Sequence, residues 1–542
     1  MKAQKERLAE LLLVAGCCAF LFFVRLGAFG LLGADEPRYA QVAREMLARH
    51  DWVTPFLNGQ PWLEKPPLYY WGAMLSYKVF GVSDWAARVP SALLASLMVL
   101  GVYAWAGRWR PAMRVDAALM AASAALVLAM ARAASTDLPL AACFTLGMLA
   151  WWSFYKTGDR TWLLAFYGCI AAATLAKGPV APVLAVLIIA AFAAVVREPE
   201  SLLHTLWPPG IAVFLLVGMP WYVMVQMRTP QFLRVFFLEQ NLARFGTNRY
   251  HHPQPFWYYL PVILAATAPW VVLVIAAAVS AVREWKRHAW HATDEDALRL
   301  FLLCWTLIPL VLFSISRSKL PAYILPAVLP LLILAADWAH SQAEQERRLP
   351  FWLAALHGAL VAAMCASVLL LPHWLLKRPA PLPAMLTASL AGTLVLAGVV
   401  LALLARGWRM LCFATLAPLL LCVGFLLRPA APAVDDSQSA RPVDEFVRAL
   451  GADPNQMVAL YGTRRDLEYG LMFYRDRRVC VYRPLEPGQP EDVRIPAEEH
   501  LVIVREGQGT ELAQLLAGRS VQFTGSYRLQ HLEIYRVEAQ PK

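Results

Sequence analysis

The sequence has few charged residues for its length. Asp, Glu, Lys and Arg make up only 16% of its 542 residues, against about 25% in an ordinary soluble domain, and 59% of the residues are hydrophobic. A soluble core of this size does not require so much apolar sequence. Together with a mean hydropathy of +0.48, this composition favours a membrane protein over a soluble globular one.

The chain also lacks cysteine motifs and long runs of like charge. None of its nine cysteines has CxxC spacing, and only Cys480 lies in the polar C-terminal part. That part therefore cannot form a disulfide of its own, and the cysteines do not indicate a metal site. The net charge of +11 is scattered between apolar segments, which argues against nucleic-acid binding.

Apolar segments of about twenty residues recur along the first 430 positions, and a helix of that length crosses about 30 Å of hydrocarbon. Because backbone groups in lipid must be paired internally, these segments predict helices. The first is expected to be an uncleaved span, although it could also be read as a signal peptide. About thirteen spans are predicted, at 8–28, 84–106, 115–134, 138–155, 161–177, 179–196, 206–226, 256–281, 299–316, 320–339, 351–371, 384–405 and 409–428.

Lys and Arg predict the orientation of these spans. They gather in alternate gaps, for example at Arg108, Lys156 and Arg347, and such gaps are typically cytoplasmic. The opposite gaps then lie outside. Since the predicted number of spans is odd, the C-terminus also lies outside, on the periplasmic side of a bacterial inner membrane.

The sequence changes character after residue 428. A Pro-, Ala- and Ser-rich stretch up to about residue 440 is typical of a linker. Short apolar runs then alternate with helix-like stretches, which predicts a small α/β domain without a catalytic motif. We therefore expect a transmembrane domain over 1–430 and a soluble periplasmic domain over 431–542.

Unusual polar residues gather in the predicted outer gaps. Asp35 follows the first span, Glu64 and Lys65 precede two prolines, Asp137 begins the fourth span and Lys177 ends the fifth. Charges at the edge of a membrane are costly unless they are paired or solvated, so a shared pocket is predicted. Arg244, Arg249 and Lys319 lie at the same depth and, with Lys177, would suit a phosphate group.

Several of these residues also have a simpler structural interpretation. Asp35 and Asp137 could cap helices, and the Lys177 side chain could extend to the membrane surface. His251 and His252 could bind a metal ion together with Glu64 or Glu239, but paired histidines in loops are more often solvated. These alternatives remain open on composition and spacing alone.

The order of several motifs resembles a known family. The segments GADEPRYAQVAREML, DWVTPFLNGQPWLEKPPLYYW, TLAKGP, FFLEQNLARFGTNRYHHPQPFWYYLP and SKLPAYILP are similar to those of integral-membrane glycosyltransferases related to protein mannosyltransferases. Among these, the chain is most similar to the bacterial aminoarabinose transferases that modify lipid A. The resemblance spans residues 1–430.

The resemblance implies a GT-C fold, an all-α membrane bundle with two juxtamembrane helices at 36–48 and 67–80. It implies inverting transfer of a sugar, here aminoarabinose, from undecaprenyl phosphate to lipid A, without a nucleotide sugar. By motif, Asp35, Asp137 and Lys65 would be catalytic. The residues implied in binding the donor and its phosphate are Lys177, Arg244, Lys319, Tyr323, Arg38 and Tyr39.

The resemblance also implies a divalent, zinc-like metal ion near Glu64. Glu239 and His251 are the further ligand candidates. The aminoarabinose transferases usually have a His near Glu239, whereas this chain reads LEQNLARF there, so no cofactor is certain.

Other functions are compatible with the composition. A related transferase could deliver another sugar to a lipid, a polysaccharide or a protein. With a hydroxyl acceptor Asp35 should act as general base, whereas a phosphate acceptor is already anionic. A lipid-linked sugar transporter would place charges or broken helices at mid-membrane, often in repeated halves. A sensor would not require Asp35, Glu64, Lys65 and Asp137 together.

Overall fold

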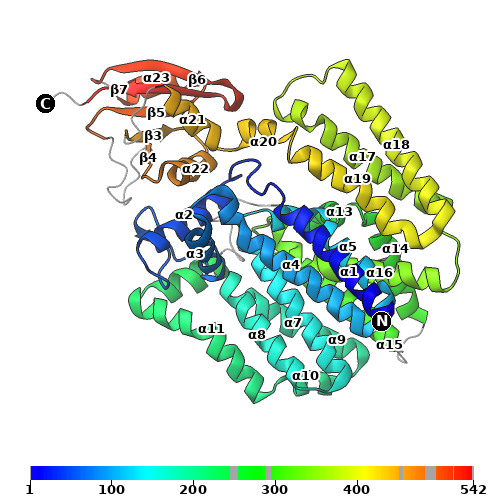
Figure 1. Cartoon of the computed structure of the whole chain (residues 1–542). Helices are drawn as coiled ribbons and strands as arrows, with labels where there is room; N and C mark the ends of the chain where they lie inside the picture. The colour runs from blue at the N-terminus through cyan, green and yellow to red at the C-terminus, as the bar shows by residue number, and fades with distance from the viewer. Residues whose placement is uncertain are drawn as a thin grey trace.

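The computed structural model describes residues 2–243, 254–287, 294–450, 456–482, 496–516 and 518–539. Each of the thirteen predicted spans coincides with a helix or with a pair of consecutive helices, packed into one bundle (Figure 1). The continuous ones are α1 (Lys2–Cys18) with η1 (Ala19–Phe23), α4 (Asp84–Trp109), α7 (Asp137–Thr157), α8 (Thr161–Lys177), α9 (Val180–Val196), α11 (Pro208–Arg228), α15 (Asp294–Ile315), α16 (Leu325–Glu344), α17 (Phe351–Leu375), α18 (Leu382–Arg406) and α19 (Leu411–Leu426).

By length and composition, seven helices of the described ranges can cross a membrane, or up to nine if each bent pair counts as one span. One of the seven covers both α18 and α19, and α8 and α9 are shorter apolar helices. The chain is therefore a multi-pass membrane protein. A short helix, α10 (Pro199–Thr205), connects α9 to α11.

Two predicted spans are bent rather than straight. α5 (Arg114–Ser123) and α6 (Ala125–Ala131) meet at 63°, and α13 (Tyr259–Thr267) and α14 (Val271–Arg287) meet at 118°. Backbone groups at the two breaks form a hydrogen bond with each other, in which the Ala125 N–H donates to the Ala268 carbonyl at 2.8 Å. The Trp270 indole donates to the Ser123 hydroxyl at 2.9 Å. Such mutual pairing permits an interrupted backbone inside a membrane protein.

The two predicted juxtamembrane helices are confirmed almost to the residue. α2 spans Asp35–Ala48 and α3 spans Leu68–Phe80. Between them, strands β1 (Phe56–Leu57) and β2 (Gln60–Pro61) form an antiparallel hairpin. The Glu45 carboxylate closes the hairpin turn by accepting from the N–H groups of Asn58 (2.8 Å) and Gly59 (2.9 Å).

A buried ion pair fixes α2 to α4. The Arg88 guanidinium is 1% exposed, lies 2.7 Å from the Glu36 carboxylate and also donates to the carbonyls of Leu26, Phe29 and Gly30. Glu36 in turn accepts from the Leu32 N–H at 3.1 Å. These bonds determine how the chain passes from the first span into α2, and hence where Asp35 lies.

Arg88→Met is therefore expected to destabilise the protein by about 3–5 kcal/mol, because it leaves the buried Glu36 carboxylate without its cation. Thermal unfolding in detergent measures the effect. The exposed Arg228–Asp51 pair provides a matched control, since Arg228→Met should cost less than about 1 kcal/mol. Equal effects of the two substitutions would contradict an anchoring role for Arg88.

The C-terminal part forms the predicted α/β unit, a five-stranded sheet in the order β4-β3-β5-β7-β6. Strands β3 (Val458–Tyr461), β4 (Cys480–Tyr482) and β5 (His500–Arg505) are parallel, whereas β6 (Val521–Tyr527) and β7 (Leu532–Val537) complete it in antiparallel fashion. The accompanying helices are α21 (Arg441–Ala449), α22 (Arg465–Arg475) and α23 (Gly509–Leu515).

The segment predicted to be a linker is helical and bonded to the bundle. Residues Ala431–Gln438 form helix α20, and Asp435 in the middle of this helix accepts a hydrogen bond from the Gly30 N–H at 2.8 Å. Asp435 also pairs with Arg441, which reaches Asp84 at 2.8 Å. The segment is therefore held in place by contacts with the first outer loop and α4, which are distant in sequence.

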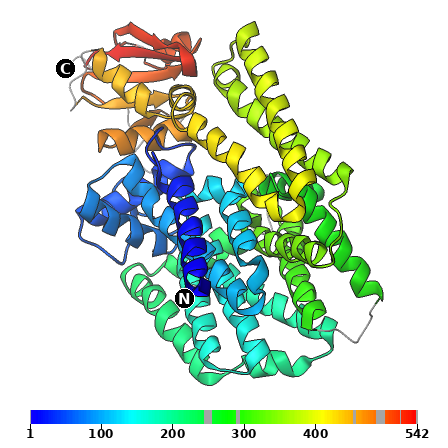
Figure 2. The same ribbon diagram turned by 45° about the vertical axis from the view of Figure 1, so that its right-hand side comes forward.

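Figures 1 and 2 place the C-terminal sheet directly above α2 and α3, at the same end of the bundle. Apolar residues of α2, α3, α22 and the sheet belong to one buried cluster, which includes Val42, Tyr77, Leu471 and Ile503. The C-terminal domain therefore packs against the juxtamembrane helices through α22, and one apolar cluster continues from these helices into the sheet.

Candidate active site

Asp35 is the first residue of α2 and does not cap it. Ala34 occupies the N-cap position without a side-chain cap, and the Asp35 carboxylate instead forms an ion pair with Arg38 one turn later. The Asp35 side chain is 53% exposed, whereas that of Arg38 is 14% exposed. The predicted alternative of a helix cap is thus replaced by a solvent-accessible carboxylate with a buried cationic partner.

Arg38 keeps its charge although it is buried. Burial would lower the pKa of its guanidinium, but neighbouring Tyr39 and the carboxylates of Asp35 and Glu64 raise it above the ordinary value. Three aromatic rings enclose the guanidinium, with Cζ 5.1 Å from the Tyr39 centroid, 5.2 Å from that of Trp62 and 5.6 Å from that of Tyr469. We call this arrangement the Arg38 enclosure.

Tyr39 is within electrostatic range of both acidic residues predicted to be catalytic. Burial raises the pKa of Tyr39 well above its ordinary value, and the charges of Asp35 and Asp137 raise it further, whereas Arg38 opposes them. Its ring packs 6.2 Å from the centroids of Tyr69 and Tyr70. Asp35 and Asp137, separated by more than a hundred residues in sequence, therefore act on one phenol.

Asp137 pairs with Lys177, as the clustering of charges predicts. Asp137 is the first residue of α7, Lys177 is the last of α8, and their side chains form a short ion pair with 14% and 15% exposure. Ser135 donates to the Asp137 carboxylate at 3.0 Å. The pair lies where two helix ends meet. Asp137 therefore does not cap its helix, and the Lys177 side chain does not extend to the membrane surface.

Lys65 and Glu64 join the same region from the loop before α3. Lys65 is 9% exposed, and its ammonium lies 3.2 Å from the Glu64 carbonyl. The Lys65 charge also acts on the Asp137 carboxylate, and Glu64 acts on Arg38. The first outer loop thus contributes both a cation and a carboxylate to the site.

The segment between α15 and α16 also contributes residues to the site. The Lys177 ammonium lies 4.4 Å from the centroid of Tyr323, in the short helix η5 (Pro321–Ile324), which is a cation–π contact. Lys319 is buried and donates to the carbonyls of Ser316 at 2.5 Å and Gln254 at 3.0 Å. Two of its three N–H groups thus hold the segment together.

Three buried polar atoms in these segments lack a hydrogen-bond partner within the described ranges. Buried polar atoms are usually satisfied, so such a group is the expected lining of a polar ligand site. They are Arg38 Nε, Thr136 Oγ1 and Ser318 Oγ.

The described residues do not fit the predicted metal ion. Within them, no three His, Cys, Asp or Glu side chains are placed to hold a metal. Glu239 lies in the π-helix η3 (Arg234–Ala243), 4.0 Å from Arg234. Arg244, Arg249, His251 and His252 lie outside the described residues, so Glu64 has no described co-ligand and no step is derived through a metal.

Trp62, Tyr70 and Tyr469 contribute to the site although sequence reasoning did not select them. Aromatic residues are frequent in this chain, 11% in all, so none of the three stands out. For Trp62 and Tyr70, the hairpin turn close to them in sequence was a local signal that this loop is structured. Nothing in the sequence indicates that Tyr469, over four hundred residues from Arg38, would reach it.

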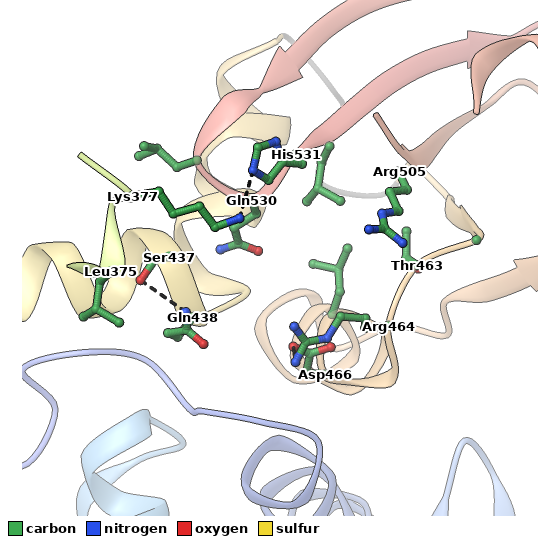
Figure 3. A pocket seen from close by; sticks show the side chains of 14 residues that line it. Leu375, Lys377, Ser437, Gln438, Thr463, Arg464, Asp466, Arg505, Gln530 and His531 are labelled. Atoms are coloured by element: carbon green, nitrogen blue, oxygen red, sulfur yellow. Dashed lines mark hydrogen bonds and ion pairs between the residues drawn. The ribbon is translucent and has the colours of Figure 1, made fainter. Parts of the chain in front are cut away.

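A pocket lies between the end of α17, α20 and the sheet, lined by other residues than those of the candidate site (Figure 3). It has a volume of about 360 Å³, and Lys377, Arg464, Arg505 and His531 line it together with leucines. Lys377 and His531 are 3.3 Å apart. None of the site residues predicted from the sequence lines this pocket.

Comparisons with known proteins agree with this architecture. The family model described as dolichyl-phosphate-mannose-protein mannosyltransferase matches residues 9–236. The crystal structures of ArnT from Cupriavidus metallidurans share the fold. The form bound to undecaprenyl phosphate has a TM-score of 0.76 at 22% identity, covering 98% of this chain and 99% of that one. The apo form has a TM-score of 0.78 at 22% identity, covering 99% and 100%.

A helical membrane bundle of this fold with a charged site beneath two juxtamembrane helices defines an integral-membrane glycosyltransferase. The undecaprenyl phosphate-α-4-amino-4-deoxy-L-arabinose arabinosyl transferase of Serratia proteamaculans is 32% identical over 440 residues, covering 78% of this chain and 76% of that protein. The namesake from Pseudomonas paraeruginosa is 31% identical over 498 residues, covering 86% and 87%. The chain belongs to this arabinosyl transferase family.

Proposed function

We propose that the protein transfers 4-amino-4-deoxy-L-arabinose from undecaprenyl phosphate to a phosphate group of lipid A. The observation that carries this proposal is the junction of Asp137 and Lys177 with Lys65 and Tyr323, at the same end of the bundle as Asp35 and Arg38. Family membership supplies the donor, and the abundance of cations around this junction suits two phosphate-bearing lipids.

The proposed chemistry is a single displacement at the anomeric carbon of the sugar. A lipid A phosphate oxygen attacks that carbon, and the bond from the carbon to the carrier phosphate oxygen breaks. The electron pair of that bond leaves with undecaprenyl phosphate, so the configuration inverts. No proton must be removed from an anionic phosphate acceptor, and no cofactor is consumed.

Lys177 is proposed to stabilise the leaving phosphate. Charge grows on that phosphate in the transition state, and a cation fixed in a poorly solvated site stabilises such charge strongly. Asp137 and the Tyr323 ring hold the ammonium in place before the donor binds. Lys319, Lys65 and Arg244 are the further cations proposed for the two phosphates.

Asp35 is proposed to act at the accessible edge of the site. With a phosphate acceptor it orients groups of the donor and balances Arg38, so a strong base is unnecessary. With a hydroxyl acceptor it would have to remove a proton. A carboxylate held in an ion pair with Arg38 is better suited to the first role, because the pair fixes its position at the edge of the site.

The site is proposed to face the periplasm. The basic gaps at Arg108, Lys156 and Arg347 support an orientation in which α2, α3 and the C-terminal sheet lie outside. The proposed division is a catalytic membrane domain over 1–430 in the inner membrane and a periplasmic domain over 431–542.

Cells that lose the protein are expected to lose aminoarabinose from their lipid A. Mass spectrometry of lipid A from cells with and without the gene measures this directly. Complementation with the unaltered gene should restore the modified species, and complementation with an inactive Lys177 variant serves as the control. An unchanged lipid A profile would contradict the proposed acceptor or sugar and favour a related transferase with a different substrate.

A further inference from the structure

We propose that Tyr469, in helix α22 of the C-terminal domain, is a positioning residue for sugar transfer. Its ring forms one wall of the Arg38 enclosure and thereby holds Arg38 against Asp35. The C-terminal domain is then part of the catalytic unit. The proposal rests on the proposed function for its kinetic consequence, but its structural claim can be tested without it.

The walls of the enclosure come from three separate parts of the chain. Tyr39 is in α2, Trp62 follows the hairpin of the first outer loop, and Tyr469 is in α22. All three rings lie within 5.1–5.6 Å of the Arg38 guanidinium carbon, the range of a cation–π contact. Only Tyr469 among them is supplied by the C-terminal domain.

Hydrogen bonds alone do not fix Arg38. Its Nη2 reaches the Asp35 carboxylate and lies 3.4 Å from the Tyr39 hydroxyl. Its buried Nε has no partner within the described ranges. The Tyr469 side chain also interacts with the guanidinium through its hydroxyl. Tyr469 therefore contributes both a ring face and a polar contact to the positioning of Arg38.

Contacts between α22 and α2 hold Tyr469 close to Arg38. One turn further along α22, the Phe473 carbonyl accepts from Arg44 of α2 at 2.8 Å. Arg44 also pairs with Asp476 at 2.8 Å. Residues four apart on a helix share a face, so the side of α22 that carries Tyr469 is the side that faces α2.

A second set of bonds ties the same end of α22 to the first outer loop and α4. The Tyr474 hydroxyl accepts from the Leu31 N–H and donates to the Asp84 carboxylate, each at 2.8 Å. Leu471 and Met472 belong to the apolar cluster that includes Tyr69 and Tyr70 of α3. The domain is thus fixed over the site through polar bonds and apolar packing together.

The aromatic ring of Tyr469 is expected to contribute more to the positioning of Arg38 than its hydroxyl contact does. Tyr469→Leu should lower kcat about tenfold, because a desolvated cation loses one of its three ring faces and can turn away from Asp35. The KM for the donor should change by less than about twofold. Tyr469→Phe, which keeps the ring, should lose less than about twofold.

The matched control is Tyr535, which lies in β7 of the same domain and donates a hydrogen bond from its hydroxyl to Glu533 of the same strand. Tyr535→Leu should leave kcat unchanged. In an Arg38→Lys background, Tyr469→Leu should cause little further loss, because both changes remove the same contact. Equal losses from Tyr469→Leu and Tyr469→Phe, or additive losses with Arg38→Lys, would overturn the proposal.

A chemical readout separates this proposal from the proposed function. Phenylglyoxal labels accessible arginines, and peptide mass spectrometry can compare Arg38 with Arg464, whose side chain is 83% exposed and serves as an internal reference. Arg38 should be protected in the wild-type protein and in Tyr469→Phe, and labelled several-fold faster in Tyr469→Leu. Unchanged protection in Tyr469→Leu would refute the enclosure even if the enzyme proves to use another substrate.

Discussion

Asp35→Asn is expected to reduce sugar transfer by about a hundredfold or more while the protein still folds into membranes. The substitution preserves size but removes the charge that pairs with Arg38 at the open edge of the site. A group that orients the reactants typically contributes on this scale, because a misplacement of about 1 Å costs about 10²-fold in rate. The measurement is transfer of sugar from undecaprenyl phosphate by the purified variant.

Stability and a distant carboxylate provide the controls for this result. The loss of stability in thermal unfolding should be smaller than for Lys177→Met, because the Asp35 side chain is 53% exposed and the Glu64 carboxylate still acts on Arg38. Asp159, which is exposed in the turn between α7 and α8, can be changed to Asn as the matched variant and should retain full activity. A fully active Asp35→Asn variant would remove this residue from the mechanism.

Lys177→Met is expected to have the second large effect, with losses of both activity and stability. Transfer should fall at least a hundredfold, since the leaving phosphate loses a fixed cation. The buried Asp137 carboxylate would also lose its partner, which should cost about 3–5 kcal/mol of stability. Transfer assays and thermal unfolding on the same preparation measure the two effects.

A double variant separates these two effects. Adding Asp137→Asn to Lys177→Met removes the unpaired charge, so stability should recover in large part while transfer stays low. If transfer recovered together with stability, the Lys177 side chain would be needed only for folding. If neither recovered, the pair would not be the source of the stability loss.

Much of the fold could be predicted because hydrophobic length is a strong local signal. The predicted helices at 36–48 and 67–80 match α2 and α3 closely. Prolines, the Asn-Gly turn and the ends of the apolar runs mark these boundaries locally. The grouping of Asp35, Asp137 and Lys177 followed from one further step, the placement of helix ends at a common depth.

The remaining features depend on contacts between distant segments. The stretch at 431–438 has the composition of a linker, but Asp435 makes it a bonded part of the structure through Gly30 and Arg441. The bends at Ala124 and Ala268 depend on each other's backbone groups. Local composition contains neither kind of information.

The same limit applies to individual side chains of the site. Asp35 and Asp137 each stand at the first position of a helix, where a cap is the local expectation. Asp35 instead pairs with Arg38 of its own helix, whereas Asp137 pairs with Lys177 of another helix. For Asp137 the choice between cap and ion pair is therefore decided by tertiary structure, and the contact of Tyr469 with Arg38 is an extreme case of such a long-range contact.

The central claim is that groups from distant segments form one site on the outer face of the membrane. Single cysteines at the exposed positions Gln60, Arg464 and Asp159, in a background without native cysteines, test it with a membrane-impermeant maleimide on intact spheroplasts. We predict that cysteines at 60 and 464 are labelled and that one at 159 reacts only after the membrane is opened. Labelling of 159 together with 60, or protection of 60 with labelling of 464, would contradict the account.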